Sequence, residues 1–88
     1  MKKGTLKNGF EFEVDEKVMD DMEFIDLLAE ADDGNPLRFS KATLILLGKD
    51  QRKRLYDSIR AEDGRVLPEV FSEVFYELLE ALGEQGKN

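Results

Sequence analysis

The sequence contains no cysteine and no histidine. Without cysteine, disulfide bonds and thiolate metal sites are excluded. Without either residue type, the usual Ser-His and Cys-His nucleophile pairs, imidazole bases and ordinary zinc sites are excluded as well. The carboxylates of aspartate and glutamate are therefore the remaining candidates for catalysis or metal binding.

Long apolar runs are also missing, because no segment approaches the roughly 20 residues that a membrane-spanning helix needs. The segment from Met1 to Thr5 lacks the apolar stretch of a signal peptide. With 41% hydrophobic and 38% charged residues among 88, the composition is typical of a small globular domain. We expect one domain over residues 1–83, no membrane contact and a cytoplasmic location.

Negative charge outweighs positive charge, and the two are unevenly distributed along the chain. The formal net charge of −7 argues against a dedicated nucleic-acid binder, whose affinity comes largely from neutralising phosphates. Between Glu11 and Asp33 the only basic residue is Lys17, whereas the segment from Arg38 to Arg60 is mainly basic. A chain with this polarity attracts copies of itself or a partner of either charge, so a homo-oligomer is one hypothesis.

Residues 4–14 are predicted to form a β-hairpin, because Asn8-Gly9 favours a tight turn and apolar residues alternate with acidic ones after it. A two-residue turn would place Leu6 opposite Glu11. A three-residue turn with Gly9 as the bulge places Leu6 opposite Phe10. We favour this second register because it keeps the apolar face intact.

The rest of the chain is predicted to be helical. The expected helices span about residues 16–32, 36–47, 50–61 and 68–82, followed by a frayed tail at 84–88. The fold class is therefore α+β and mainly α, with the hairpin and about four helices packed on one core.

Local signals set these helix boundaries. Asp15 is expected to cap the first helix. Asn35 and Pro36 are expected to start the second helix, and Gly48 to end it. The segment 44–47 is apolar on all sides, which favours a central position for the second helix.

The first helix carries more apolar residues than one stripe accommodates. The predicted buried stripe consists of Val18, Met22, Ile25 and Ala29. Acidic residues occupy the opposite side, so we interpret them as a solvated face rather than a converging site. Phe24, Leu27 and Leu28 form an apolar shoulder beyond the stripe. Two interpretations remain open: another helix covers this shoulder, or it is a docking patch with an acidic rim.

Motifs for chemistry are absent. The serines have no visible activating base, and Gly83 to Asn88 lacks the full spacing of a phosphate loop. Asp32-Asp33-Gly34-Asn35 is followed by Pro36-Leu37, which breaks the pattern of a calcium loop. The short basic run from Lys49 to Tyr56 is weak support for nucleic-acid binding. We expect no catalytic residue, no metal, no cofactor and no nucleic-acid partner, and therefore a protein that is not an enzyme.

Two passages carry a resemblance to a known family. From Asn8 to Leu37 an acidic hairpin leads into an acidic helix, and Leu46 to Val66 reads LLGKDQRKRLYDSIRAEDGRV before the terminal GKN. In these passages the chain resembles the small tail assembly chaperones of long-tailed phages (siphoviruses) that infect Gram-positive bacteria. The resemblance covers most of the chain and lies in its overall pattern, without a catalytic motif.

The resemblance implies a non-enzymatic protein of the infected cell's cytoplasm that is not part of the mature virion. Such a protein binds the phage tape measure protein, keeps it soluble and helps recruit tail tube protein subunits, and it is often made in a second, frameshifted length. Candidate partner-binding residues are Phe24, Leu27, Leu28, Phe71, Phe75, Tyr76 and Leu79. The alternative is a small acidic protein-interaction module or a mimic of nucleic acid.

Overall fold

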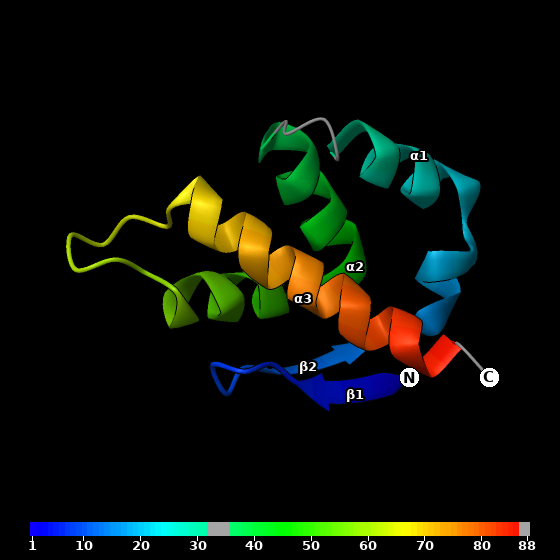
Figure 1. Ribbon diagram of the computed structural model, residues 1–88, viewed down its shortest axis with the longest axis horizontal. Helices are drawn as coiled ribbons and strands as arrows, with labels where there is room; N and C mark the ends of the chain where they lie inside the picture. The colour runs from blue at the N-terminus through cyan, green and yellow to red at the C-terminus, as the bar shows by residue number, and fades with distance from the viewer. Residues whose placement is uncertain (32–35, 87–88) are drawn as a thin grey trace.

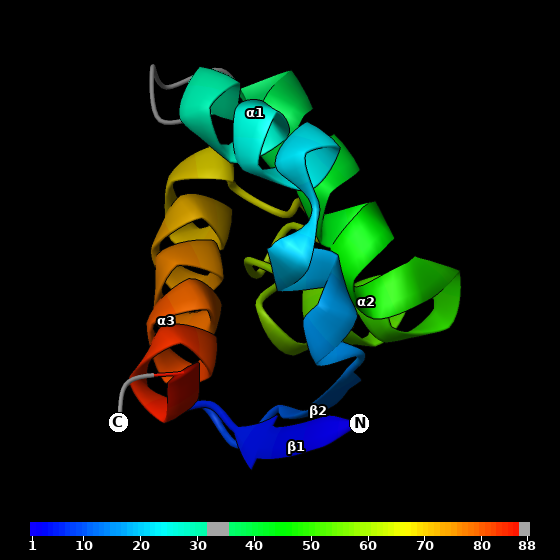
Figure 2. The same cartoon turned by 90° about the vertical axis from the view of Figure 1, so that its right-hand side faces the viewer.

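The computed structural model describes residues 1–31 and 36–86. Its elements are β1 (Lys2–Thr5), β2 (Glu11–Val14), a short 3-10 helix η1 (Glu16–Asp20), and the helices α1 (Met22–Ala31), α2 (Pro36–Ser58) and α3 (Pro68–Gly86). The hairpin and α1 lie at opposite ends of the molecule, and α2 and α3 run between them (Figures 1 and 2). The mainly helical α+β class is confirmed, but the described residues form three α-helices rather than four.

The hairpin has the register that the apolar pattern predicts. The backbone N–H of Leu6 donates to the carbonyl of Phe10 at 2.9 Å, and Gly9, at φ 90°, occupies the bulge. The side chain of Asn8 accepts a hydrogen bond from the N–H of Phe10 at 2.9 Å, which holds the turn closed. Because this register places the apolar side chains on one face, both Leu6 and Phe10 are buried.

Side chains from the helices fasten the hairpin to the core. The amide of Gln51 on α2 pairs with the backbone of Glu13, accepting from its N–H and donating to its carbonyl, both at 2.7 Å. The carboxylate of Glu77 on α3 accepts from the N–H of Lys7 at 2.7 Å. The two-stranded sheet is therefore held by both long helices, which a hairpin of this size needs for stability.

The predicted first helix is divided in two. Asp15 caps η1, as expected, by accepting from the N–H of Lys17 at 3.0 Å. Asp21 then adopts an extended conformation and accepts from the N–H of Glu23 at 2.9 Å, which starts α1 afresh. The prediction of one helix over 16–32 is wrong because Asp21 favours a cap over a helix interior.

The predicted second and third helices are joined into α2, which bends sharply (Figure 1). At the bend Gly48 has φ 82° and ψ 170°, a conformation open essentially only to glycine. Gly48 thus interrupts the helix where predicted, and the helical segments before and after it meet at this bend within α2. The predicted cap Asn35 lies outside the described residues, whereas Pro36 does begin α2.

Helix α3 begins at Pro68, as predicted, and continues to Gly86, beyond the predicted end before Gly83. Its buried residues recur every three or four positions, and Phe71 and Phe75 among them pack against aromatic rings of α2. The core of the described structure contains Leu6, Phe10, Phe12, Val14, Phe24, Leu27, Ala31, Phe39, Ala42, Leu46, Leu47, Leu55, Phe71, Phe75, Leu78 and Leu82.

Candidate partner-binding surface

Helix α1 is turned relative to the prediction. Phe24, Leu27 and Ala31 are buried, with Phe24 only 1% exposed. Met22 and Ile25, which the spacing places in the buried stripe, are 66% and 42% exposed. The apolar shoulder is therefore the buried side. Met22, Ile25 and Ala29 of the predicted core stripe are exposed, and Val18 is partly buried against the core.

The break at Asp21 and the packing of α2 account for this turn. Had the helix run on from η1, Val18 would have continued the row of Met22 and Ile25, but the break removes that continuity. Helix α2 packs against α1 and covers the shoulder, and Arg38 pairs with Glu30 across the two helices at 3.0 Å. The large aromatic ring of Phe24 gains more free energy from burial than the smaller side chains of Met22, Ile25 and Ala29.

The outer side of α1 combines apolar and acidic side chains. Met22, Ile25 and Ala29 are exposed at the helical spacing of one face. Glu23 and Asp26, also exposed, lie beside this row on the helix surface. We call Met22, Ile25 and Ala29 together the α1 face.

The first half of α2 also leaves apolar side chains outside. Leu37, Leu44 and Ile45 are exposed, whereas Leu46 and Leu47 are buried. The prediction that the whole segment 44–47 is central is therefore half correct, because a helix at the surface of a small domain buries only one side.

The candidate residues named from the sequence do not form one surface. Phe24, Leu27, Phe71 and Phe75 are buried, and Leu28 and Leu79 are partly buried against the core. Tyr76 is the exposed member of the set. The α1 face was missed because its residues had been assigned to the core, although their spacing did identify them as one row.

The aromatic candidates on α3 build the interface with α2. The ring of Phe39 packs edge-on against Phe75 at 5.3 Å and against Tyr76 at 5.5 Å between centroids. The ring of Phe71 packs edge-on against Tyr56 at 5.6 Å. Such edge-to-face pairs add to the stability gained from area burial alone, so these rings hold the two helices together.

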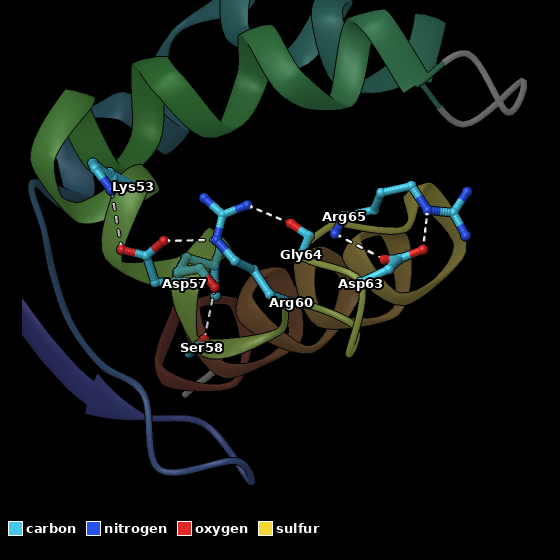
Figure 3. Close-up of polar contacts among 8 residues, drawn as sticks. Lys53, Asp57, Ser58, Arg60, Asp63, Gly64 and Arg65 are labelled. Atoms are coloured by element: carbon cyan, nitrogen blue, oxygen red, sulfur yellow. Dashed lines mark hydrogen bonds and ion pairs between the residues drawn. The ribbon is translucent and has the colours of Figure 1, made fainter.

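A set of ion pairs braces the loop from α2 to α3 (Figure 3). Arg60 donates to Asp57 at 2.9 Å and to the carbonyl of Gly64 at 2.9 Å. Arg65 donates to Asp63 through its side chain at 2.7 Å and its backbone N–H at 3.0 Å. The loop is thus folded back on the end of α2 by charged hydrogen bonds.

These contacts lower the pKa of two carboxyl groups. Hydrogen bonds from Arg60 and then Lys53 lower the pKa of Asp57 below its ordinary value. Hydrogen bonds from the backbone and then the side chain of Arg65 lower the pKa of Asp63. Both carboxyls are exposed and satisfied by neighbouring cations, which is the arrangement of a structural brace rather than of a catalytic acid.

The described residues contain neither a metal site nor a membrane span. No group of three or more acidic residues converges as a metal site within residues 1–31 and 36–86. No helix in the same part of the chain has the length and apolarity to cross a bilayer.

The α1 face is thus the clearest candidate functional surface: an exposed apolar row with carboxylates at its side, presented by a short helix. Comparison of the chain with protein-family models, with curated proteins and with solved structures found no match.

Proposed function

We propose that this protein is a non-enzymatic tail assembly chaperone of a long-tailed phage of Gram-positive bacteria. It binds the tape measure protein, keeps that long helical chain soluble and helps recruit tail tube protein. It acts in the cytoplasm of the infected host and is left out of the mature virion. The proposal rests on the sequence resemblance described above and on one structural observation, the α1 face.

The α1 face suits an amphipathic helical client. Met22 and Ile25 stand one helical turn apart, the spacing at which an apolar row meets the apolar row of another helix. A client segment with apolar residues aggregates on its own, and covering its apolar row removes that surface from water. Binding to the α1 face therefore stabilises the client in solution.

The acidic residues beside the α1 face select the client by charge. Glu23 and Asp26 are exposed and are not joined to a cation by the ion pairs of the described residues. They favour a client whose apolar row is flanked by lysine or arginine, and they repel an acidic one. This role replaces the binding role that the sequence suggested for the buried Phe24 and Leu27.

A matched pair of substitutions tests the proposal. Ile25 on α1 and Ile45 on α2 have the same side chain and similar exposure, 42% and 46%. Each is replaced by glutamate, and each variant is co-expressed with the tape measure protein encoded by the same phage. We expect Ile25→Glu to reduce the co-purified and soluble tape measure protein at least tenfold, since it places a charge in the apolar contact. Ile45→Glu is expected to retain most of it.

Two results would contradict the proposal in different ways. Equal loss in both variants would remove the assignment to the α1 face. Failure of the unsubstituted protein to form a complex with the tape measure protein, or to keep it soluble, would remove the chaperone function itself.

A further inference from the structure

A small apolar pocket lies at the bend of α2, on a different part of the molecule from the α1 face. We call it the elbow pocket. The two halves of α2 contribute one residue each, and the following loop and the start of α3 complete the wall. The pocket is lined by Ser40, Tyr56, Val66, Pro68 and Phe71 and has a volume of about 250 Å³. This size suits one aliphatic or aromatic side chain and is below the usual range for whole cofactors.

The pocket has a polar edge. The hydroxyls of Ser40 and Tyr56 are 3.4 Å apart across the bend. The guanidinium of Arg52 donates to the hydroxyl of Ser40 at 3.2 Å and to its carbonyl at 3.3 Å. The same group lies over the ring of Tyr56, with its carbon 5.6 Å from the ring centroid. Arg52 is therefore fixed beside the pocket, with one face on an aromatic ring.

Three of the five arginines, Arg38, Arg60 and Arg65, pair with a carboxylate, whereas Arg54 lies over the ring of Phe10. Among the described side chains no ion pair joins Arg52 to an acid, although it is partly buried and the chain carries a net charge of −7. Arginine presents a planar set of donors that matches a carboxylate, and partial burial strengthens such a pair. A fixed, partly buried guanidinium beside an apolar pocket has the composition of a receptor for an apolar carboxylate.

We propose that the elbow pocket binds the C-terminal residue of a partner polypeptide that ends in a large apolar residue. Its side chain enters the pocket lined by Ser40, Tyr56, Val66, Pro68 and Phe71, and its terminal carboxylate pairs with Arg52. A chain terminus carries the carboxylate one bond from the atom that bears the side chain, and this spacing matches a one-residue pocket with the cation at its edge. The site is independent of the α1 face and of the chaperone function.

The loop braced by ion pairs keeps this pocket open. Val66 follows Arg65, whose contacts with Asp63 hold the loop in place. Gly48 sets the angle between the two halves of α2 and so the distance between Ser40 and Tyr56. A preformed pocket costs little ordering of the protein when the ligand binds.

The experiment is a titration of the full chain with a hexapeptide that ends in phenylalanine with a free carboxylate. Binding is followed by the backbone amide signals of Ser40, Tyr56 and Val66 in nuclear magnetic resonance spectra. We expect saturable shifts at these residues, and at least tenfold weaker binding when the same peptide is amidated at its C-terminus. A peptide that ends in serine should also bind at least tenfold more weakly, because the pocket then stays empty. These two comparisons leave the protein unchanged, so they do not depend on the folding of a variant.

Two protein variants then test whether Arg52 is the cation that binds the peptide carboxylate. Arg52→Gln should weaken the binding of the free-carboxylate peptide at least tenfold and bring it to the level of the amidated one. Lys49→Gln, which removes one exposed charge a turn earlier on α2, should change binding less than twofold. Equal binding of the free and amidated peptides, or shifts confined to other residues, would overturn the proposal. Binding of 3-phenylpropionate as tight as that of the peptide would overturn the polypeptide terminus as the occupant and assign the pocket to a small free acid.

Discussion

Helices α1 and α3 are both amphipathic and acidic, but they use their apolar residues differently. In α3 the large apolar side chains of the described part are buried or partly buried except Tyr76, and exposed positions such as Glu73 and Glu80 are acidic. In α1, which has 10 residues, Met22 and Ile25 point outward although Phe24 and Leu27 already anchor the helix. The apolar side of α3 is thus covered by the fold itself, whereas α1 leaves apolar side chains exposed, and these form the surface that we propose for the client.

Truncating one apolar side chain on each helix should separate α1 from α3 most strongly. Phe75 on α3 is 0% exposed and Ile25 on α1 is 42% exposed. Phe75→Ala should destabilise the fold by about 3–5 kcal/mol through the cavity it leaves between α2 and α3. Ile25→Ala should change stability by no more than about 0.5 kcal/mol, since little surface returns to water.

Urea unfolding of both variants, followed by circular dichroism, measures these values. A loss of stability in Ile25→Ala that approaches that of Phe75→Ala would mean that the α1 face is packed in solution. The distinction between the two helices would then disappear.

The next effect concerns α2, which packs under α1 and beside α3 because it bends. Gly48 has φ 82°, and a Cβ added there meets no atom within 4 Å. Gly48→Ala should therefore cost about 1–3 kcal/mol from backbone strain alone. Straightening of the bend would also separate Ser40 from Tyr56, so the peptide titration of the elbow pocket should weaken along with stability. Unchanged stability in urea unfolding would show that the bend does not require glycine.

A smaller difference between α1 and α3 lies in how the N-terminus of each helix is capped. At both starts a backbone carbonyl, that of Asp21 or Leu67, accepts from the N–H four residues later, but only Asp21 adds a side-chain cap, which accepts from the N–H of Glu23 at 2.9 Å. Asp21→Ala should cost about 1 kcal/mol, the usual value of an N-cap. Hydrogen exchange should become faster in the amides of α1 and stay unchanged in those of α3. Equal acceleration in both helices would mean that the cap acts on the whole fold.

How much of this structure the sequence predicts depends on how local each cause is. The hairpin register follows from Gly9 and the alternation around it, so it was predictable. The phase of α1 was not, because Met22-Ile25-Ala29 and Phe24-Leu27-Ala31 both have helical spacing. Only the packing of α2 decides between these two rows, and the break at Asp21 separates α1 from the preceding segment.

The same limit applies to both candidate sites. The residues of the α1 face were visible in the sequence, but the apolar pattern alone assigns such a row to the core. The elbow pocket brings Ser40 and Arg52 together across Gly48, and an interrupted helix does not specify the angle at which its halves meet. Its position therefore follows from the bend rather than from any motif.

The smallest expected effect concerns the ion-pair brace between α2 and α3, for which α1 offers an unpaired counterpart. The hydrogen bonds from Arg60 and Lys53 lower the pKa of Asp57 in the folded state. Because the folded pKa is below the unfolded one, the brace stabilises the fold above the ordinary pKa of 3.8, and this contribution is lost as the pH falls through the folded pKa. Asp57→Asn should thus lower the Tm slightly at pH 7 and have little effect near pH 2.

Asp26→Asn on α1, which also removes one exposed carboxylate, should leave the Tm unchanged or raise it at pH 7, since it breaks no ion pair and reduces the net negative charge. A drop in Tm at pH 7 that is the same for both variants would show that Arg60 stabilises the loop through Gly64 alone and that Asp57 is only one more surface charge.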